Sequence, residues 1–195
     1  MWEVSRQEQT VSWADFHAVI QIRHGYLDVK NRRVDPSGTI KAMTALDPRG
    51  TTAAVIVTHR RVELLKHSLE QVVNQTHPVD WVIVVDNGAQ DEVRQLLDDL
   101  AAERAVYLPS KTNLGGAGGF AYGFLHALAL GADAIWCADD DGRPKDHTVL
   151  EELYRVAAKH QLAEVSPVVA NIDDPEKLAF PLRQGTTWHR RVDEL

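Results

Sequence analysis

Three consecutive aspartates, Asp139 to Asp141, directly follow an apolar run and are the strongest candidates for chemistry in the sequence. Adjacent carboxylates repel one another, so a bound cation would offset the cost of placing them together. In an extended segment, Asp139 and Asp141 point to the same side and could share one ion. Hard oxygen ligands suit Mg²⁺ or Mn²⁺, either of which can also hold a diphosphate. The pattern favours a metal site, with a solvated acidic turn as the alternative.

A glycine-rich segment, 113–119, is the second candidate. Glycine allows the backbone to approach a ligand closely, and a following helix offers free N–H groups and the positive end of its dipole. Asn113 could add a donor beside Gly115 and Gly116. The same composition also suits a flexible loop or the close packing of a helix on a strand. The segment therefore indicates a phosphate-binding loop only together with its neighbours.

Hydrophobic periodicity predicts the elements that position these residues. Apolar runs indicate buried strands at 53–57, 81–85, 105–108 and 134–138, and 163–170 is a candidate for a fifth. Apolar residues at helical spacing indicate helices at 62–73, 91–104, 120–130 and 148–160. Strands that are apolar throughout and alternate with helices predict an α/β fold. The expected architecture is Rossmann-like, a mainly parallel sheet with helices on both faces.

Ligands of an open parallel sheet bind beyond the carboxyl ends of its strands. The segments that follow the first four predicted strands are polar or rich in glycine, at 58–61, 86–88, 111–119 and 139–142. The predicted sheet brings all four to one edge, which makes that edge the candidate site. His59, Arg60 and Arg61 could meet a phosphate or a base there, and Asp86 could accept a hydrogen bond from a base.

Composition narrows the class of protein. The 195-residue chain carries a net charge of −7, which argues against a general nucleic-acid binder. Its single cysteine, Cys137, excludes an intramolecular disulfide and a multi-cysteine zinc site. The sequence shows neither a signal peptide nor an apolar run of the ~20 residues that a membrane span needs. We therefore expect a cytoplasmic protein that binds no nucleic acid.

The first 50 residues do not share the pattern of the rest, because they follow neither helical nor strand periodicity. We expect residues 1–50 to form an N-terminal extension that is poorly ordered or reflects the choice of start site. The compact domain is expected at 51–195, and Met43 is a plausible start for it.

An NAD(P)-dependent Rossmann dehydrogenase is one alternative, because 116–121 matches the G-x-G-x-x-A fingerprint and Asp139 lies where a ribose-binding acid is found. Against it, residues 110–115 separate the motif from its strand, and the motif normally follows the first strand. A single ribose contact also does not require three carboxylates. A non-catalytic nucleotide-binding module is a further alternative.

The sequence resembles family 2 glycosyltransferases in the segments 55–61, 84–87, 113–120 and 136–142. Within that family, 163–167, 171–175 and 178–182 are similar to galactofuranosyltransferases of cell-wall synthesis. The resemblance implies a GT-A fold and an inverting transfer of galactofuranose from UDP-galactofuranose. The implied acceptor is a polyprenyl-linked glycan, so the resemblance also implies peripheral association with the inner face of the plasma membrane.

The resemblance assigns roles to individual residues. Thr58, Arg60 and Asp86 would hold the uridine. Asn113 and the glycine segment with Gly115 and Gly116 would line the ribose and diphosphate. The metal, Mn²⁺ or Mg²⁺, would be bound by Asp139 and Asp141, with Asp140 nearby.

Inverting enzymes of this kind use a carboxylate base from the acceptor-binding half. No match to that base precedes Leu195. We therefore expect the base to lie beyond Leu195 and the nucleotide-sugar-binding domain at 51–195 to be incomplete at its C-terminal end.

Overall fold

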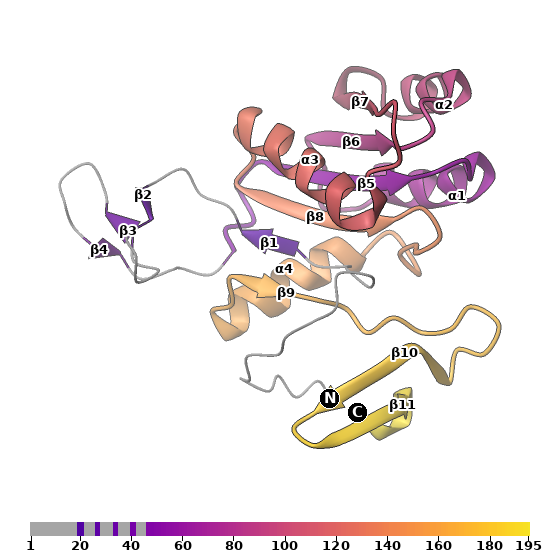
Figure 1. Ribbon diagram of the computed structural model, residues 1–195. Helices are drawn as coiled ribbons and strands as arrows, with labels where there is room; N and C mark the ends of the chain where they lie inside the picture. Colours follow the sequence, from indigo (N-terminus) through magenta and orange to yellow (C-terminus); the bar gives the residue numbers. More distant parts are fainter. Residues whose placement is uncertain (1–18, 22–25, 28–32, 35–39, 42–45) are drawn as a thin grey trace. The chain divides into compact units, whose positions relative to one another are not determined.

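The structure is a computed structural model that describes residues 19–21, 26–27, 33–34, 40–41 and 46–195 (Figure 1). The described residues divide into two compact units, one ending at Ser166 and one from Pro167 to Leu195. No helix among the described residues is long and apolar enough to cross a membrane.

The first unit contains a six-stranded sheet in the order β7-β6-β5-β8-β1-β9. Its four apolar strands run parallel, as the sequence predicts: β5 (Thr52–Thr58), β6 (Trp81–Asp86), β7 (Ala105–Pro109) and β8 (Ala134–Asp139). In β5, β6 and β8 the side chains alternate between the two faces and nearly all are buried, so these strands are apolar almost throughout. Strand β7 is less buried.

Helices cover both faces of the parallel strands, which confirms the predicted architecture. One hydrophobic layer packs against α1 (Val62–Val73), α2 (Asp91–Ala101) and α4 (Val149–His160). The other packs against α3 (Gly115–Ala129), which crosses in front of β5 and β6 in Figure 1. A short 3₁₀ turn, η1 (Ala102–Arg104), joins α2 to β7.

Helix α3 begins at Gly115, five residues before the predicted start at Phe120. The expectation of a loop across 113–119 was therefore wrong for residues 115–119, which are helical. Glycine lowers helix propensity, but two glycines of α3 have a packing function. A Cβ on Gly119 would lie 2.6 Å from Val57 Cγ1, and one on Gly123 would lie 2.4 Å from Val55 Cγ1. The absence of side chains there lets the helix lie directly on β5.

Strand β1 (Val19–Gln21) belongs to the sheet, although no pattern in the sequence predicts it. It pairs antiparallel with β8 on one side and with β9 (Glu164–Val165) on the other. The extension at 1–50 stays a prediction, because most of it lies outside the described residues. The predicted strand at 163–170 is reduced to β9.

Two small antiparallel sheets complete the described chain. The first joins β2 (Tyr26–Leu27), β3 (Arg33–Val34) and β4 (Ile40–Lys41). The second, in the unit from Pro167, is a hairpin closed at Gly185, whose φ is 61°. The elements at this end of the chain are β10 (Lys177–Gln184), β11 (Thr187–Arg191) and η2 (Val192–Glu194).

The glycines of α3 allow a direct test of the packing argument. We expect Gly123→Ala to destabilise the fold by about 1–3 kcal/mol, because the new methyl group would overlap Val55. Gly116→Ala is the matched control, since a Cβ there meets nothing within 4 Å. Urea unfolding measures both. Equal stabilities of the two variants would contradict the assignment of Gly123 to close packing.

The contribution of β1 can be measured by shortening the chain to begin at Met43. The shortened chain keeps the four parallel strands and Leu46, whose N–H donates to the carbonyl of Leu162 at 3.0 Å. We expect cooperative melting with a midpoint lowered by less than about 10 °C, because the six-stranded sheet loses only the short strand β1 and the strands β2 to β4 belong to a separate sheet. Non-cooperative melting in circular dichroism would show that the removed residues complete the core.

Candidate functional site

The carboxyl ends of the parallel strands bring the predicted site residues to one edge of the sheet. Thr58, at the end of β5, is level with Asp86 at the end of β6, and Val57 is level with Asp139 at the end of β8. The predicted convergence of the strand ends is therefore confirmed.

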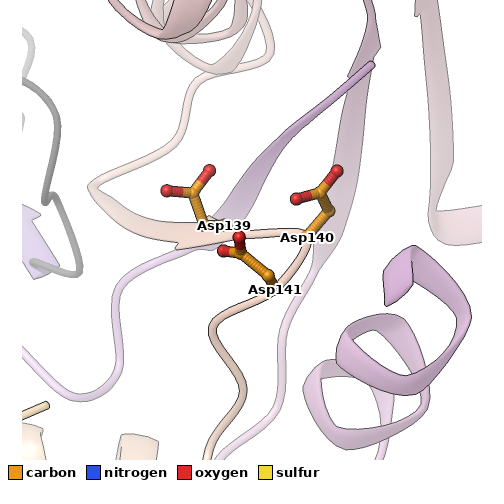
Figure 2. A group of neighbouring side chains, drawn as sticks. All are labelled: Asp139, Asp140 and Asp141. Carbon is orange, nitrogen blue, oxygen red and sulfur yellow. The ribbon is translucent and has the colours of Figure 1, made fainter. Parts of the chain in front are cut away.

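The three aspartates form a compact group at the end of β8. Each offers one carboxylate oxygen, and these oxygens lie within 4.8 Å of one another. Figure 2 shows the three side chains at consecutive positions of the backbone, where the strand ends. Asp140 is buried, Asp139 is partly buried and Asp141 is exposed. The two aspartates predicted to bind metal are thus the accessible ones.

Asp140 is fixed by two neighbours on β5 and at the start of α1. Thr58 Oγ1 donates to Asp140 Oδ2 at 2.7 Å, and Arg61 Nε donates to the same oxygen at 3.1 Å. Arg61 Nη1 also donates to Asp141 Oδ2 at 2.8 Å. Thr58 and Asp140, both predicted site residues, therefore meet directly. Arg61, which the sequence suggested only as a contact to a phosphate or a base, joins them.

Burial and neighbouring charges change the pKa values of Asp140 and Arg61. Burial raises the pKa of Asp140 above its ordinary value, and the hydrogen bond from Thr58 and the charge of Arg61 oppose that rise only in part. Burial lowers the pKa of Arg61, but the negative charges of Asp140 and Asp141 outweigh it and raise the pKa overall. The charge of Arg61 therefore offsets part of the cost of burying the Asp140 carboxylate.

Ser68 holds the backbone of the aspartate segment and was missed by sequence reasoning. Its Oγ lies 3.0 Å from the carbonyl of Asp139 and 3.2 Å from that of Gly142, and it can donate to either. The side chain is buried on the core-facing side of α1, beside Leu65 and Leu69. A polar residue on an otherwise apolar helical face was the signal that could have identified it.

Asp86 organises the turn after β6. Its Oδ1 accepts the N–H of Gly88 at 2.8 Å, and its Oδ2 accepts the N–H of Gln90 at 2.6 Å and the hydroxyl of Tyr107 at 2.9 Å. Asp86 is 0% exposed. These bonds keep both oxygens occupied within the protein. A contact of Asp86 with uridine stays a prediction.

Arg60 and His59 lie at the same edge. Arg60 has a left-handed backbone with φ 57°, a conformation that is uncommon for a residue with a side chain. Its Cγ lies 3.2 Å from where a Cβ on Gly88 would be, so its stem rests against the turn that Asp86 holds. His59 is partly buried, and its Nδ1 is a buried atom without a hydrogen-bond partner among the described residues.

The start of α3 is tied to β6 by Asn87. The N–H of Leu114 donates to Asn87 Oδ1 at 3.1 Å, and Asn87 Nδ2 donates to the carbonyl of Gly115 at 3.4 Å. Asn113 Oδ1 accepts the N–H of Gly115 at 2.8 Å. Added Cβ atoms on Gly115 and Gly116 would meet nothing within 4 Å, so these glycines leave open space rather than serve packing. The glycine segment therefore serves two purposes. Gly115 and Gly116 leave room for a ligand, whereas Gly119 allows close packing of the helix on β5.

The donor set suits a hard divalent cation. Carboxylates Asp139 and Asp141 supply oxygen ligands, which Mg²⁺ and Mn²⁺ prefer, and the neighbouring Arg61 already shows that a positive charge is favoured there. The first turn of α3, with its open glycines, lies at the same edge. The N–H of Gly115 is taken by Asn113, whereas those of Gly116 and Ala117 have no partner within the helix and can face an anion.

The chain belongs to the glycosyl transferase family 2, whose model matches residues 53–193. The matched residues include all the site residues described above. The mainly parallel α/β sheet is therefore of the GT-A type, as the sequence predicted.

Curated relatives are galactofuranosyltransferases. The chain is 59% identical over 142 residues to galactofuranosyltransferase GlfT1 of Mycolicibacterium smegmatis, covering 73% of this chain and 47% of that protein. It is 56% identical over 144 residues to GlfT1 of Mycobacterium tuberculosis, with the same coverage of each chain. The chain thus spans about half the length of the curated relatives it matches.

The solved structures that match this chain have lower sequence identity to it than the curated relatives do. The crystal structure of S. aureus TarS has a TM-score of 0.49 and 16% identity, covering 56% of this chain and 20% of that one. The mannosyltransferase PcManGT from Pyrobaculum calidifontis, in complex with GDP-Man and Mn²⁺, has a TM-score of 0.44 and 20% identity, covering 65% and 36%.

The role of Asn87 can be tested by substitution. We expect Asn87→Ala to lower the free energy of unfolding by about 1–2 kcal/mol, because the N–H of Leu114 loses its partner. Hydrogen exchange at Leu114 should accelerate in parallel. Asn74→Ala is the control, since Asn74 is exposed and bonds only within its own helix end. Unchanged exchange at Leu114 would show that Asn87 does not hold the start of α3.

Proposed function

We propose that this chain is the donor-binding part of an inverting galactofuranosyltransferase. In this proposal, it binds UDP-galactofuranose with a divalent metal for transfer of the sugar to a lipid-linked glycan in cell-wall synthesis. The observation that carries the proposal is that two features lie at the same sheet edge: Asp139 and Asp141 at the end of β8, and the open start of α3, which Asn87 ties to the end of β6. Membership of the family and the identity to galactofuranosyltransferases support the substrate class.

Each residue of the edge has a proposed part in holding the donor. Asp139 and Asp141 would bind Mn²⁺ or Mg²⁺, whose chemistry is to neutralise charge on the UDP leaving group. Asp140, buried against Thr58, holds the segment in place. The open first turn of α3, with Asn113, Gly115 and Gly116, would face the diphosphate.

The uridine would lie at the end of β5 and β6. Thr58 and Asp86 are level in the sheet, and Arg60 rests against Gly88 beside them. Arg60 is exposed and His59 is partly exposed, so both can reach a base or ribose. Because the bonds of Asp86 are satisfied internally, its proposed part is chiefly to shape this turn.

The acceptor in this proposal is a polyprenyl-linked glycan at the membrane surface, which would place the protein on the inner face of the plasma membrane. The resemblance of 163–182 to galactofuranosyltransferases supports it. The catalytic base stays unassigned among the described residues.

The dehydrogenase alternative has no support. The G-x-G-x-x-A match follows β7, the edge strand of the sheet, whereas a dinucleotide fingerprint follows the central first strand. The family match also includes that segment. A non-catalytic module differs from the proposal only in turnover, which a transfer assay with UDP-galactofuranose and a lipid-linked acceptor measures.

Titration calorimetry tests the donor site. We expect UDP to bind with Mn²⁺ and far more weakly without it, and Asp141→Ala to reduce the Mn²⁺-dependent affinity by at least about tenfold, because one carboxylate ligand is lost. Asp99→Ala, on the exposed side of α2, removes the same charge away from the site and should change nothing. NAD and NADP should not bind. Metal-independent UDP binding that survives Asp141→Ala would overturn the metal assignment.

A further inference from the structure

Arg61 supplies positive charge to two aspartates through different nitrogen atoms. Its Nε donates to Asp140 at 3.1 Å, and its Nη2 lies 2.5 Å from the other oxygen of Asp140. Its Nη1 donates to Asp141 at 2.8 Å. One guanidinium therefore bridges the buried and the exposed member of the aspartate group.

The two ends of this bridge differ in burial. The Asp140 side chain is 0% exposed, whereas those of Arg61 and Asp141 are 45% and 53% exposed. Separating Arg61 from Asp140 would leave a buried charge uncompensated, which is costly. An ion pair between two exposed groups contributes little and exchanges readily. The contact with Asp140 is therefore the anchor, and the contact with Asp141 is the one that can open.

We propose that Arg61 is a positioning residue that holds Asp141 until a divalent ion arrives with a diphosphate. The inference rests on the proposed function for the metal role of Asp139 and Asp141. A guanidinium and a divalent ion repel each other when both lie against one carboxylate, so the bare ion must displace Nη1 of Arg61. A rotation of the guanidinium about its anchor on Asp140 releases Asp141 while the bond from Thr58 stays intact.

The diphosphate changes this balance because it brings negative charge. An ion bound to UDP is partly neutralised, so its repulsion by Arg61 is smaller than that of the bare ion. The freed Nη1 also remains beside the site, where it can face the phosphates. Arg61 therefore makes the site prefer the metal–nucleotide pair over the free metal.

Manganese titration without nucleotide tests the proposal, with free Mn²⁺ followed by electron paramagnetic resonance. We expect Arg61→Met to bind bare Mn²⁺ on the order of tenfold more tightly than the native chain, because one like charge beside the ion is removed. Adding Asp141→Asn to that variant should abolish the gain. Arg155→Met is the control: Arg155 forms an exposed ion pair with Glu152 on α4, so its loss changes the net charge equally.

A second measurement uses the native fold and does not depend on Arg61→Met. The ¹⁵N-resolved Nε–Hε signal of Arg61, identified by its loss in Arg61→Lys, should persist and shift when Mg²⁺ is added. Persistence reports the anchor on Asp140, and the shift reports release of Asp141.

The proposal is overturned if Arg61→Met binds bare Mn²⁺ no more tightly than the native chain, including the case in which neither binds. It is also overturned if the Nε–Hε signal is unchanged once calorimetry shows Mg²⁺ bound. UDP calorimetry on the native chain distinguishes a failure of the proposed function from a failure of the role proposed for Arg61. Failure to bind UDP counts against the proposed function, whereas the manganese comparison tests Arg61 alone.

Discussion

The register of the four parallel strands is the constraint on which the rest of the structure depends. Alternating side chains of β5, β6, β7 and β8 fill two hydrophobic layers, so a slip of one residue would turn every apolar side chain to the wrong layer. The same register fixes which residues lie opposite one another at the strand ends, Thr58 with Asp86 and Val57 with Asp139. The hydrophobic core thus positions the polar edge.

At that edge the fold includes a buried charge. Asp140 is 1% exposed, and its desolvation is offset by Thr58 and Arg61, which lie about 80 residues away in the sequence. The arrangement ties the end of β8 to the end of β5 and the start of α1. It leaves Asp139 and Asp141, the candidate metal ligands, on either side of a residue that is held in place.

The four parallel strands and the type of every major helix were predictable from the sequence, because each buried face leaves a regular apolar pattern. The start of α3 was not, because low helix propensity at Gly115 to Gly119 indicated a loop. The decisive fact was the closeness of Gly119 and Gly123 to β5, which is a tertiary contact. Strand β1 was missed because three residues between two sheet neighbours are too short for a period of two to be recognised.

The sequence by itself determined that the polar clusters would meet at one edge, since parallel strands that are apolar throughout must place their carboxyl ends together. It also determined the carboxylate chemistry of Asp139 to Asp141. Only the tertiary structure decided which neighbours touch. Arg61, rather than Arg60, reaches the aspartates, while Arg60 adopts a left-handed backbone and rests against Gly88. The physical reason is that side-chain directions in a turn depend on backbone angles set by the packing of distant segments, which leave no periodic pattern in the sequence.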